Sequence, residues 1–286
     1  MSLRGKAKRR VSVRETRGLR RGHGGAPRLK WLALSALVAV CASLAALAAF
    51  LALRPGSSEQ PGPPRAAIVD QLSLTSPNSA FVQEATSMLE GAGYAVDYYP
   101  GEQVTIEFYQ DLPRHHYEVV VLRVHSARFQ TDDGILTDEV VLFTGQPYDR
   151  QRYVAERKAG ILARARYFLT NPPGYFFGVR AKFVESRMKG DFEGATVILM
   201  GCDGLRSNTM AEAFVRKGAG AFVSWDDLVS TDHTDAATER LLHYLLVEKR
   251  TLSEAIAQTM AEIGPDPSYG SKLLVYPPEA SASAPH

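Results

Sequence analysis

The stretch YEVVVLRVHSA, residues 117–127, contains an apolar run that stops at a histidine. A second stretch, GATVILMGCDG at residues 194–204, stops in the same way at a cysteine. Short runs rich in valine, isoleucine and leucine predict buried strands, and burial on both faces is typical of a parallel sheet. We therefore expect two core strands whose carboxyl ends carry His125 and Cys202.

The rest of the chain alternates strand-like and helix-like segments. Further strands are expected at residues 66–74, 94–99 and 221–225, a short hairpin arm at 139–144, a helical turn or two at 104–112, and helices at 79–92, 150–168, 208–217, 234–247 and 252–263. The last helix begins with a capping box of Thr251 and Glu254. This alternation predicts an α/β fold with a doubly wound, mostly parallel sheet and helices on both faces. In such sheets, functional residues gather beyond the carboxyl ends of the strands.

The amino-terminal part of the chain has a different composition. Residues 1–30 contain eleven Lys and Arg and one acidic residue, a net charge of +10, whereas residues 31–286 sum to −8 because the whole chain is +2. Residues 31–53 contain no charged side chain. As a helix they would span roughly 34 Å, enough for a hydrocarbon core of about 30 Å. We expect a single transmembrane helix in contact with lipid, a cytoplasmic amino terminus and an extracytoplasmic carboxyl-terminal domain.

Residues 31–53 and the basic leader each have alternative interpretations. A cleaved signal peptide or a buried helix could account for residues 31–53, but signal peptides have apolar segments of only about 7 to 15 residues. The basic leader could bind nucleic acid, although membrane topology and anionic lipid explain it more simply, and no nucleic-acid partner is expected. Residues 54–65 are predicted to be a Pro/Gly-rich linker, residues 66–276 one domain, and residues 277–286 a disordered tail.

His125 and Cys202 form a candidate catalytic pair. Neighbouring parallel strands lie about 4.8 Å apart, so side chains at their ends can approach each other. A free thiol has a pKa of about 8.5, and a nearby imidazole can accept its proton. Backbone N–H groups at Ser126 and Gly201 would stabilise an oxyanion during acyl transfer. From the residues alone, a buried structural cysteine and a structural histidine remain equally open.

The order strand–His, intervening segment, strand–Cys-x-Gly resembles the caspase-like cysteine peptidases, which include gingipain, clostripain, separase and CHAT domains. The stretch GLRSNTMAEAFVRKGAGAFVSWDDLVS after Cys202 is similar to the CHAT and gingipain arrangement of helix, Gly-Ala turn and strand ending near a tryptophan. The resemblance covers residues 66–248. It implies a caspase-like three-layer sandwich with a mostly parallel central sheet, His125 as general base and Cys202 as nucleophile. The family usually has glycine after its histidine, where this chain has Ser126.

The resemblance also suggests a substrate preference. Family members that cut after Arg or Lys place an acid at the base of the pocket, and a carboxylate matches the geometry of a guanidinium. Trp225, Asp226 and Asp227 are therefore candidate substrate-binding residues, with a solvated loop or a helix amino-terminal acid as the alternative. Residues 143–179 form a long insert rich in Tyr and Phe. The insert is either a binding surface or a helix with packed aromatic residues.

The stretch TDHTD contains Asp232, His233 and Asp235, whose residue types resemble those of a metal site. Residues 231–234 are instead interpreted as the capped start of a helix, and no metal or cofactor is expected. The sequence thus predicts a membrane-anchored, extracytoplasmic cysteine peptidase that acts on peptides or proteins and cleaves after basic residues. The alternative is a non-catalytic sensor or binding domain on the same scaffold. A serine hydrolase has less support because the chain has no G-x-S-x-G motif.

Overall fold

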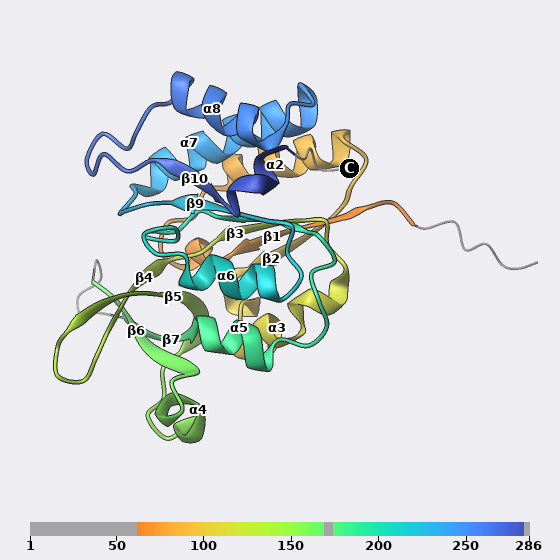
Figure 1. Cartoon of the computed structure of the whole chain (residues 1–286). Coiled ribbons are helices and arrows are strands. Elements are labelled where there is room, and N and C mark those ends of the chain that lie inside the picture. Colours follow the sequence, from red (N-terminus) through yellow and green to blue (C-terminus); the bar gives the residue numbers. More distant parts are fainter. Residues whose placement is uncertain (1–61, 169–173, 283–286) are drawn as a thin grey trace, which may run out of the picture. The chain divides into compact units, whose positions relative to one another are not determined.

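The computed structural model describes residues 62–168 and 174–282. The predicted leader, membrane helix and most of the predicted linker lie outside these residues. Within the two described ranges, no helix combines the length and the apolar composition needed to cross a membrane. The described part contains a six-stranded sheet with helices on both faces and a second, four-stranded sheet beside it (Figure 1).

Sheet A has the strand order β2-β1-β3-β8-β9-β10. Its strands are β1 (Arg65–Asp70), β2 (Ala95–Pro100), β3 (Val119–Arg123), β8 (Thr196–Leu199), β9 (Ala221–Trp225) and β10 (Leu273–Tyr276). All neighbouring strands are parallel except β10, which is antiparallel to β9. Every residue of β3 and of β9 is buried, as continuous apolar runs predict. The predicted α/β class with a mostly parallel sheet is confirmed.

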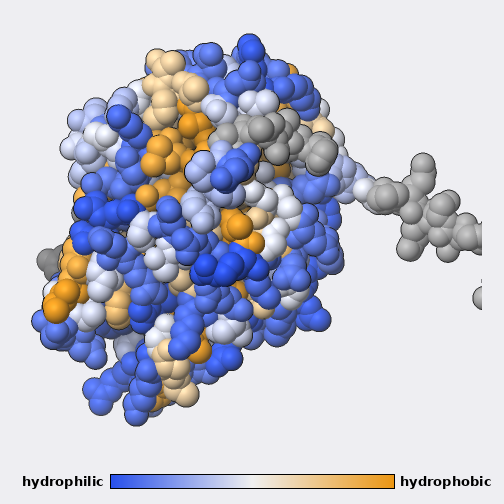
Figure 2. Space-filling model, in the orientation of Figure 1, coloured by the Kyte–Doolittle hydropathy of each residue, from blue (hydrophilic) through white to orange (hydrophobic). Residues whose placement is uncertain are grey.

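Helices cover both faces of sheet A (Figure 1). One face carries α2 (Ser79–Gly91), α7 (Thr231–Leu242) and α8 (Leu252–Glu262), and the other carries α3 (Ile106–Asp111), α5 (Ala181–Arg187) and α6 (Thr209–Arg216). The sheet separates two hydrophobic cores. Phe81 packs in the core on the first face, and Phe183 and Phe214 pack in the core on the second. On the surface shown in Figure 2, apolar residues form separate areas rather than one continuous patch.

The helix boundaries follow from local sequence chemistry. The side chain of Asn78 accepts a hydrogen bond from the N–H of Phe81 and so caps α2. The capping box of Thr251 and Glu254 at the start of α8 is present as predicted. Gly218, with φ of 93°, follows α6 in the left-handed conformation that glycine adopts without strain.

Most of sheet B was not predicted from the sequence, although the hairpin arm expected at residues 139–144 is part of its longest strand. Its order is β4-β5-β7-β6, all antiparallel, with β4 (Ser126–Gln130), β5 (Leu136–Pro147), β6 (Leu162–Tyr167) and β7 (Gly174–Arg180). The helix predicted at residues 150–168 is wrong: only α4 (Val154–Lys158) is helical there. The reason is that β6 alternates buried and exposed residues along most of its length, which suits one face of a sheet.

Two other boundaries differ from those predicted. The strand predicted at residues 66–74 ends at Asp70, and Gln71–Leu74 form a 3₁₀ turn in which the Asp70 carboxylate accepts from the N–H of Ser73. Helix α7 begins at Thr231 instead of residue 234, with Ser230 as its N-cap residue and no side-chain capping bond. Its continuation, His243–Val247, is π-helical. Short 3₁₀ turns also occur at Gly101–Gln103, Leu112–His115 and Pro278–Ala282.

Candidate active site

The segments that carry His125 and Cys202 lie side by side. Strands β3 and β8 are parallel neighbours, with Leu122 opposite Leu199, so both segments leave the same edge of sheet A. The hydroxyl of Ser126 donates a hydrogen bond to the carbonyl of Cys202 at 2.5 Å. A Cβ atom at Gly201 would collide with Ser126, so only glycine permits this close approach.

His125 is held by residues that follow β1. Its Nε2 atom lies 2.9 Å from the Thr75 hydroxyl, and its backbone N–H donates to the side-chain carbonyl of Gln71 at 2.9 Å. The imidazole packs 4.7 Å from the ring of Tyr167 and 5.7 Å from that of Phe143, measured between centroids. Burial, with a further contribution from the charge of Arg123, lowers the pKa of His125 to about 4. The imidazole is therefore neutral at neutral pH and can act as a base.

Cys202 is held by residues that follow β9. Its Sγ atom lies 3.6 Å from the carbonyl oxygen of Val229, to which the thiol donates, and accepts from the N–H of Val229 at 3.4 Å. Among the described residues, no hydrogen bond joins Cys202 to His125. The two side chains thus leave neighbouring strands but contact different loops.

The thiol of Cys202 keeps its proton more strongly than a free cysteine does. Burial raises its pKa and outweighs the lowering effect of the Val229 N–H. The carboxylates of Asp203, Asp266 and Asp227 raise it further, because a thiolate would be repelled by them. Neutral imidazole and protonated thiol are the resting forms, so a preformed ion pair is not present.

Donors for an oxyanion are available next to the sulfur. In the described part of the chain, the N–H groups of Gly201 and Cys202 have no hydrogen-bond acceptor. Ser126, the other predicted oxyanion residue, is buried, and its hydroxyl is occupied by the Cys202 carbonyl. Gly201 itself is buried, and Cys202 is half-buried.

The predicted substrate-binding residues separate in the structure. Trp225 is fully buried, and its indole N–H donates to the Thr234 hydroxyl at 2.9 Å. Asp226 accepts from the N–H of Lys272 at 2.7 Å, which holds the end of β9 to the start of β10. Only Asp227 offers a partly exposed carboxylate on the side of Cys202.

Arg206, shortly after the cysteine in sequence, lies among three acidic side chains. Its Nη1 atom lies 2.8 Å from Asp227 and 3.6 Å from Asp203, and its Nε atom lies 3.7 Å from Asp138. Asp203 is buried, adopts a left-handed φ of 61°, and has one carboxylate oxygen without a hydrogen bond among the described residues. Burial and the charge of Asp227 raise the pKa of Asp203.

A buried ionic network lies beneath this edge of the sheet. Arg123 is fully buried and donates to both oxygens of Asp235 at 2.8 Å and to Asp70 at 2.7 Å. Asn78 donates to Asp235 at 2.9 Å, and Tyr98 donates to Asp70 at 3.1 Å. One cation and two carboxylates thus fix β1, β3 and α7 relative to one another, directly below His125.

The TDHTD residues take separate positions. Asp235 faces Arg123, Asp232 is exposed, and the Nε2 atom of His233 lies 3.2 Å from the carbonyl of Gly264. Within residues 62–168 and 174–282, no group of three or more His, Cys, Asp or Glu side chains is arranged to hold a metal ion.

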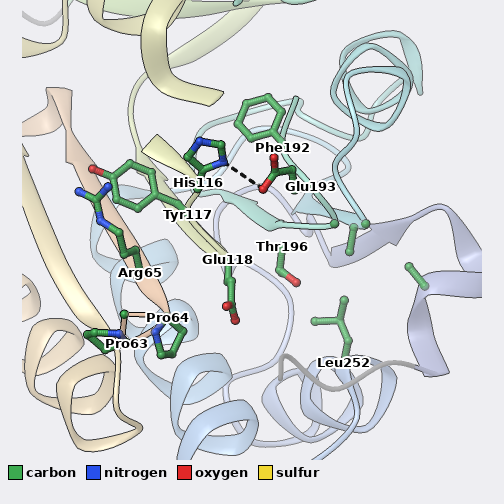
Figure 3. Close-up of a pocket in the computed structure, with 15 residues that line it drawn as sticks. Pro63, Pro64, Arg65, His116, Tyr117, Glu118, Phe192, Glu193, Thr196 and Leu252 are labelled. Carbon is green, nitrogen blue, oxygen red and sulfur yellow. Dashed lines mark hydrogen bonds and ion pairs between the residues drawn. The ribbon is translucent and has the colours of Figure 1, made fainter. Parts of the chain in front are cut away.

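A cavity of about 670 Å³ lies at the opposite edge of sheet A, where the strands begin (Figure 3). Figure 3 shows Glu118 and Thr196 on its wall and His116 bonded to Glu193 across it. No candidate catalytic residue lines this cavity. This cavity and the candidate catalytic residues therefore lie at opposite edges of the sheet.

Sequence reasoning missed the residues that hold the pair in place. Gln71 falls within the strand predicted at residues 66–74, and Thr75 follows that strand. Arg123 falls within an apolar run. The available signal was a charged residue inside a valine-rich strand, which must be paired if it is buried. The chain matches no protein-family model and no curated protein.

Proposed function

We propose that this chain is a cysteine peptidase with a caspase-like fold, in which Cys202 is the nucleophile and His125 the base. The observation that carries the proposal is the placement of both residues after adjacent parallel strands, with their backbones joined through Ser126. A mostly parallel sheet with helices on both faces suits the resemblance, and the free N–H groups of Gly201 and Cys202 suit an oxyanion.

The proposed reaction is acyl transfer from a peptide bond. The thiol gives its proton to neutral His125 while Sγ bonds to the carbonyl carbon, and the oxyanion is stabilised by the N–H groups of Gly201 and Cys202. The C–N bond then breaks, and His125 returns the proton to the leaving amine. Water hydrolyses the thioester and regenerates the thiol. The thiol must first leave Val229 and turn toward the imidazole.

A preference for basic side chains fits the acids beside the cysteine. Asp227 and Asp203 can pair with a guanidinium or an ammonium, but Arg206 already occupies that position. A substrate Arg or Lys would therefore have to displace Arg206. We propose Asp227 as the contact for this side chain, with Asp226 and Trp225 supporting the strand end.

The decisive experiment is hydrolysis of a peptide library containing Arg, Lys and neutral residues by the full-length chain in detergent. Cys202→Ala and His125→Ala should each lower the rate by a factor of at least about 10². Ser207→Ala serves as the matched control because, within the described residues, this nearby hydroxyl donates hydrogen bonds only to Asp138 and Thr209. Full activity of Cys202→Ala would exclude the mechanism.

A non-catalytic sensor or binding domain is the second candidate. The raised pKa of Cys202 and its hydrogen bonds to Val229 favour this reading, because they describe a packed structural thiol. The chain has one other cysteine, Cys41, within residues 31–53. With Cys41 replaced by Ala, this candidate predicts that iodoacetamide reacts with the folded chain at least about tenfold more slowly than with the urea-unfolded chain. It also predicts that an acyl-forming peptide probe leaves Cys202 unlabelled.

We further propose that residues 31–53 anchor the domain in the cell membrane with the domain on the extracytoplasmic side. The uncharged length and the preceding basic block support this orientation. Resistance to carbonate extraction, together with cleavage of the domain by protease added to intact cells, is the expected result. Release of the chain by carbonate would contradict the anchor.

A further inference from the structure

Strand β6 carries two exposed arginines stacked on aromatic rings. Arg164 and Arg166 are exposed on β6 and lie opposite Phe177 and Tyr175 of β7. The Arg164 guanidinium lies 5.1 Å from the centre of the Tyr175 ring, and that of Arg166 lies 5.9 Å from it. Stacking orients both guanidinium groups while leaving their N–H edges available.

Neither arginine is neutralised. Among the described residues, no carboxylate forms an ion pair with Arg164 or Arg166, whereas Arg180 on the neighbouring strand pairs with Glu139. The difference matters because an arginine that only stabilises the fold is commonly paired with an acid. These two exposed cations have no carboxylate partner among the described residues.

The segment that contains Arg164 and Arg166 is basic, whereas the rest of residues 31–286 is acidic. Residues 148–168 contain six Lys and Arg and two acids, a net charge of +4. Residues 31–286 sum to −8, so the part outside this segment sums to −12. A basic area on an otherwise acidic chain attracts anionic partners to one place.

Strand β6 is also an edge strand. Sheet B ends at β6, and within the described ranges no strand pairs with its outer side (Figure 1). Edge strands present unpaired N–H and C=O groups that can bind an extended chain. Charges on such a strand also prevent aggregation, which is the ordinary structural reason for them. Prevention of aggregation requires charge alone and does not explain why arginines at every second position are held in place by aromatic rings.

We propose that β6 binds an extended acidic polypeptide segment, which adds to sheet B as a further strand. Arg164 and Arg166 are two residues apart, a separation of about 6.8 Å in a strand, so they match carboxylates at alternate positions of a paired strand. Nucleic acid and anionic lipid share the negative charge but would not use the strand edge. This surface does not depend on the proposed peptidase activity.

The test uses the full-length chain in detergent and a labelled peptide in which Glu alternates with Val. Fluorescence anisotropy measures affinity, and hydrogen exchange measures protection of residues 162–167. Arg164→Gln/Arg166→Gln should weaken binding at least about tenfold. The matched control Arg187→Gln/Arg216→Gln removes two cations on α5 and α6 and should change binding less than about twofold. Every variant keeps the basic leader, so binding of the peptide to the leader is the same in the test variant and in the control.

Protection of residues 162–167 by the peptide, lost in Arg164→Gln/Arg166→Gln, is the expected result. A peptide with the same Glu and Val residues grouped into two blocks should give weaker binding, because alternation is lost. The proposal is overturned if the peptide leaves β6 unprotected or if the control pair weakens binding equally. It is also overturned if oligo(dT) or phosphatidylglycerol vesicles bind through the same arginines more tightly than the peptide does.

Discussion

The two edges of sheet A differ in how they hold charge. At the carboxyl edge, Arg123, Asp70 and Asp235 have side chains that are 0 to 4% exposed. At the amino edge, the side chains of His116 and Glu193, which contact each other, are 64% and 63% exposed, and those of the pair Arg65 and Asp97 are 41% and 40% exposed, beside a cavity. Buried charges must be paired in fixed geometry, whereas exposed ones are screened by water. The candidate catalytic residues therefore lie at the carboxyl edge, where buried charges hold the strands in place, and not at the amino edge beside the cavity.

The largest effect is expected from breaking the buried network. Arg123→Met would leave two buried carboxylates without a cation, and we expect the free energy of unfolding to fall by about 3–5 kcal/mol. Denaturant unfolding of the domain, followed by circular dichroism, measures this change. A loss below about 1 kcal/mol would mean that the carboxyl edge is no more dependent on its charges than the amino edge.

A smaller effect should appear as a pH dependence that comes from His125. Its pKa falls from 6.5 to about 4 on folding. Between these two values the unfolded chain binds a proton that the folded chain does not, so the free energy of unfolding falls as the pH falls through this window. The loss is on the order of 3 kcal/mol for a shift of this size.

His125→Asn is the comparison that isolates this contribution. Unfolding curves at about pH 7.5 and about pH 4.5 should show a smaller loss of stability in the variant than in the natural chain. Equal losses in both proteins would show that the imidazole is not buried as described.

The smallest effect is expected at the amino edge. His116→Asn removes the exposed pair with Glu193 but keeps a residue that tolerates the left-handed φ of 53°. The free energy of unfolding should change by less than about 0.5 kcal/mol. A loss comparable to that of Arg123→Met would end the distinction between the two edges.

Strands β1, β3, β8 and β9 of sheet A could be predicted because they contain continuous apolar runs, whereas β10 at the edge of the sheet was not predicted. Residues 117–124 are rich in valine, and β3 is found at Val119–Arg123. Sheet B could not be predicted in the same way. Residues 150–168 contain good helix formers, and β6 becomes a strand because it pairs with β7, the next strand along the chain. The alternation of Ala and Arg in β6 was the only local signal.

The candidate pair was predictable in position but not in orientation. Strand order placed His125 and Cys202 at one edge, whereas the contacts of His125 with Thr75 and of Cys202 with Val229 depend on loops that no periodicity describes. The buried position of Asp203 likewise follows from the turn after the cysteine and its N–H bond to Asp227. Such features require the folded chain.

The protonated state of the sulfur has a consequence for its chemical lifetime. Oxidation by peroxides and exchange with disulfides begin with attack by the thiolate, so a thiol whose pKa is raised by burial is oxidised slowly. Cys202 is the single cysteine within residues 62–168 and 174–282, and so it has no second sulfur there with which to close a cross-link. The domain can therefore spend long periods in an oxidising medium and still retain a reduced sulfur.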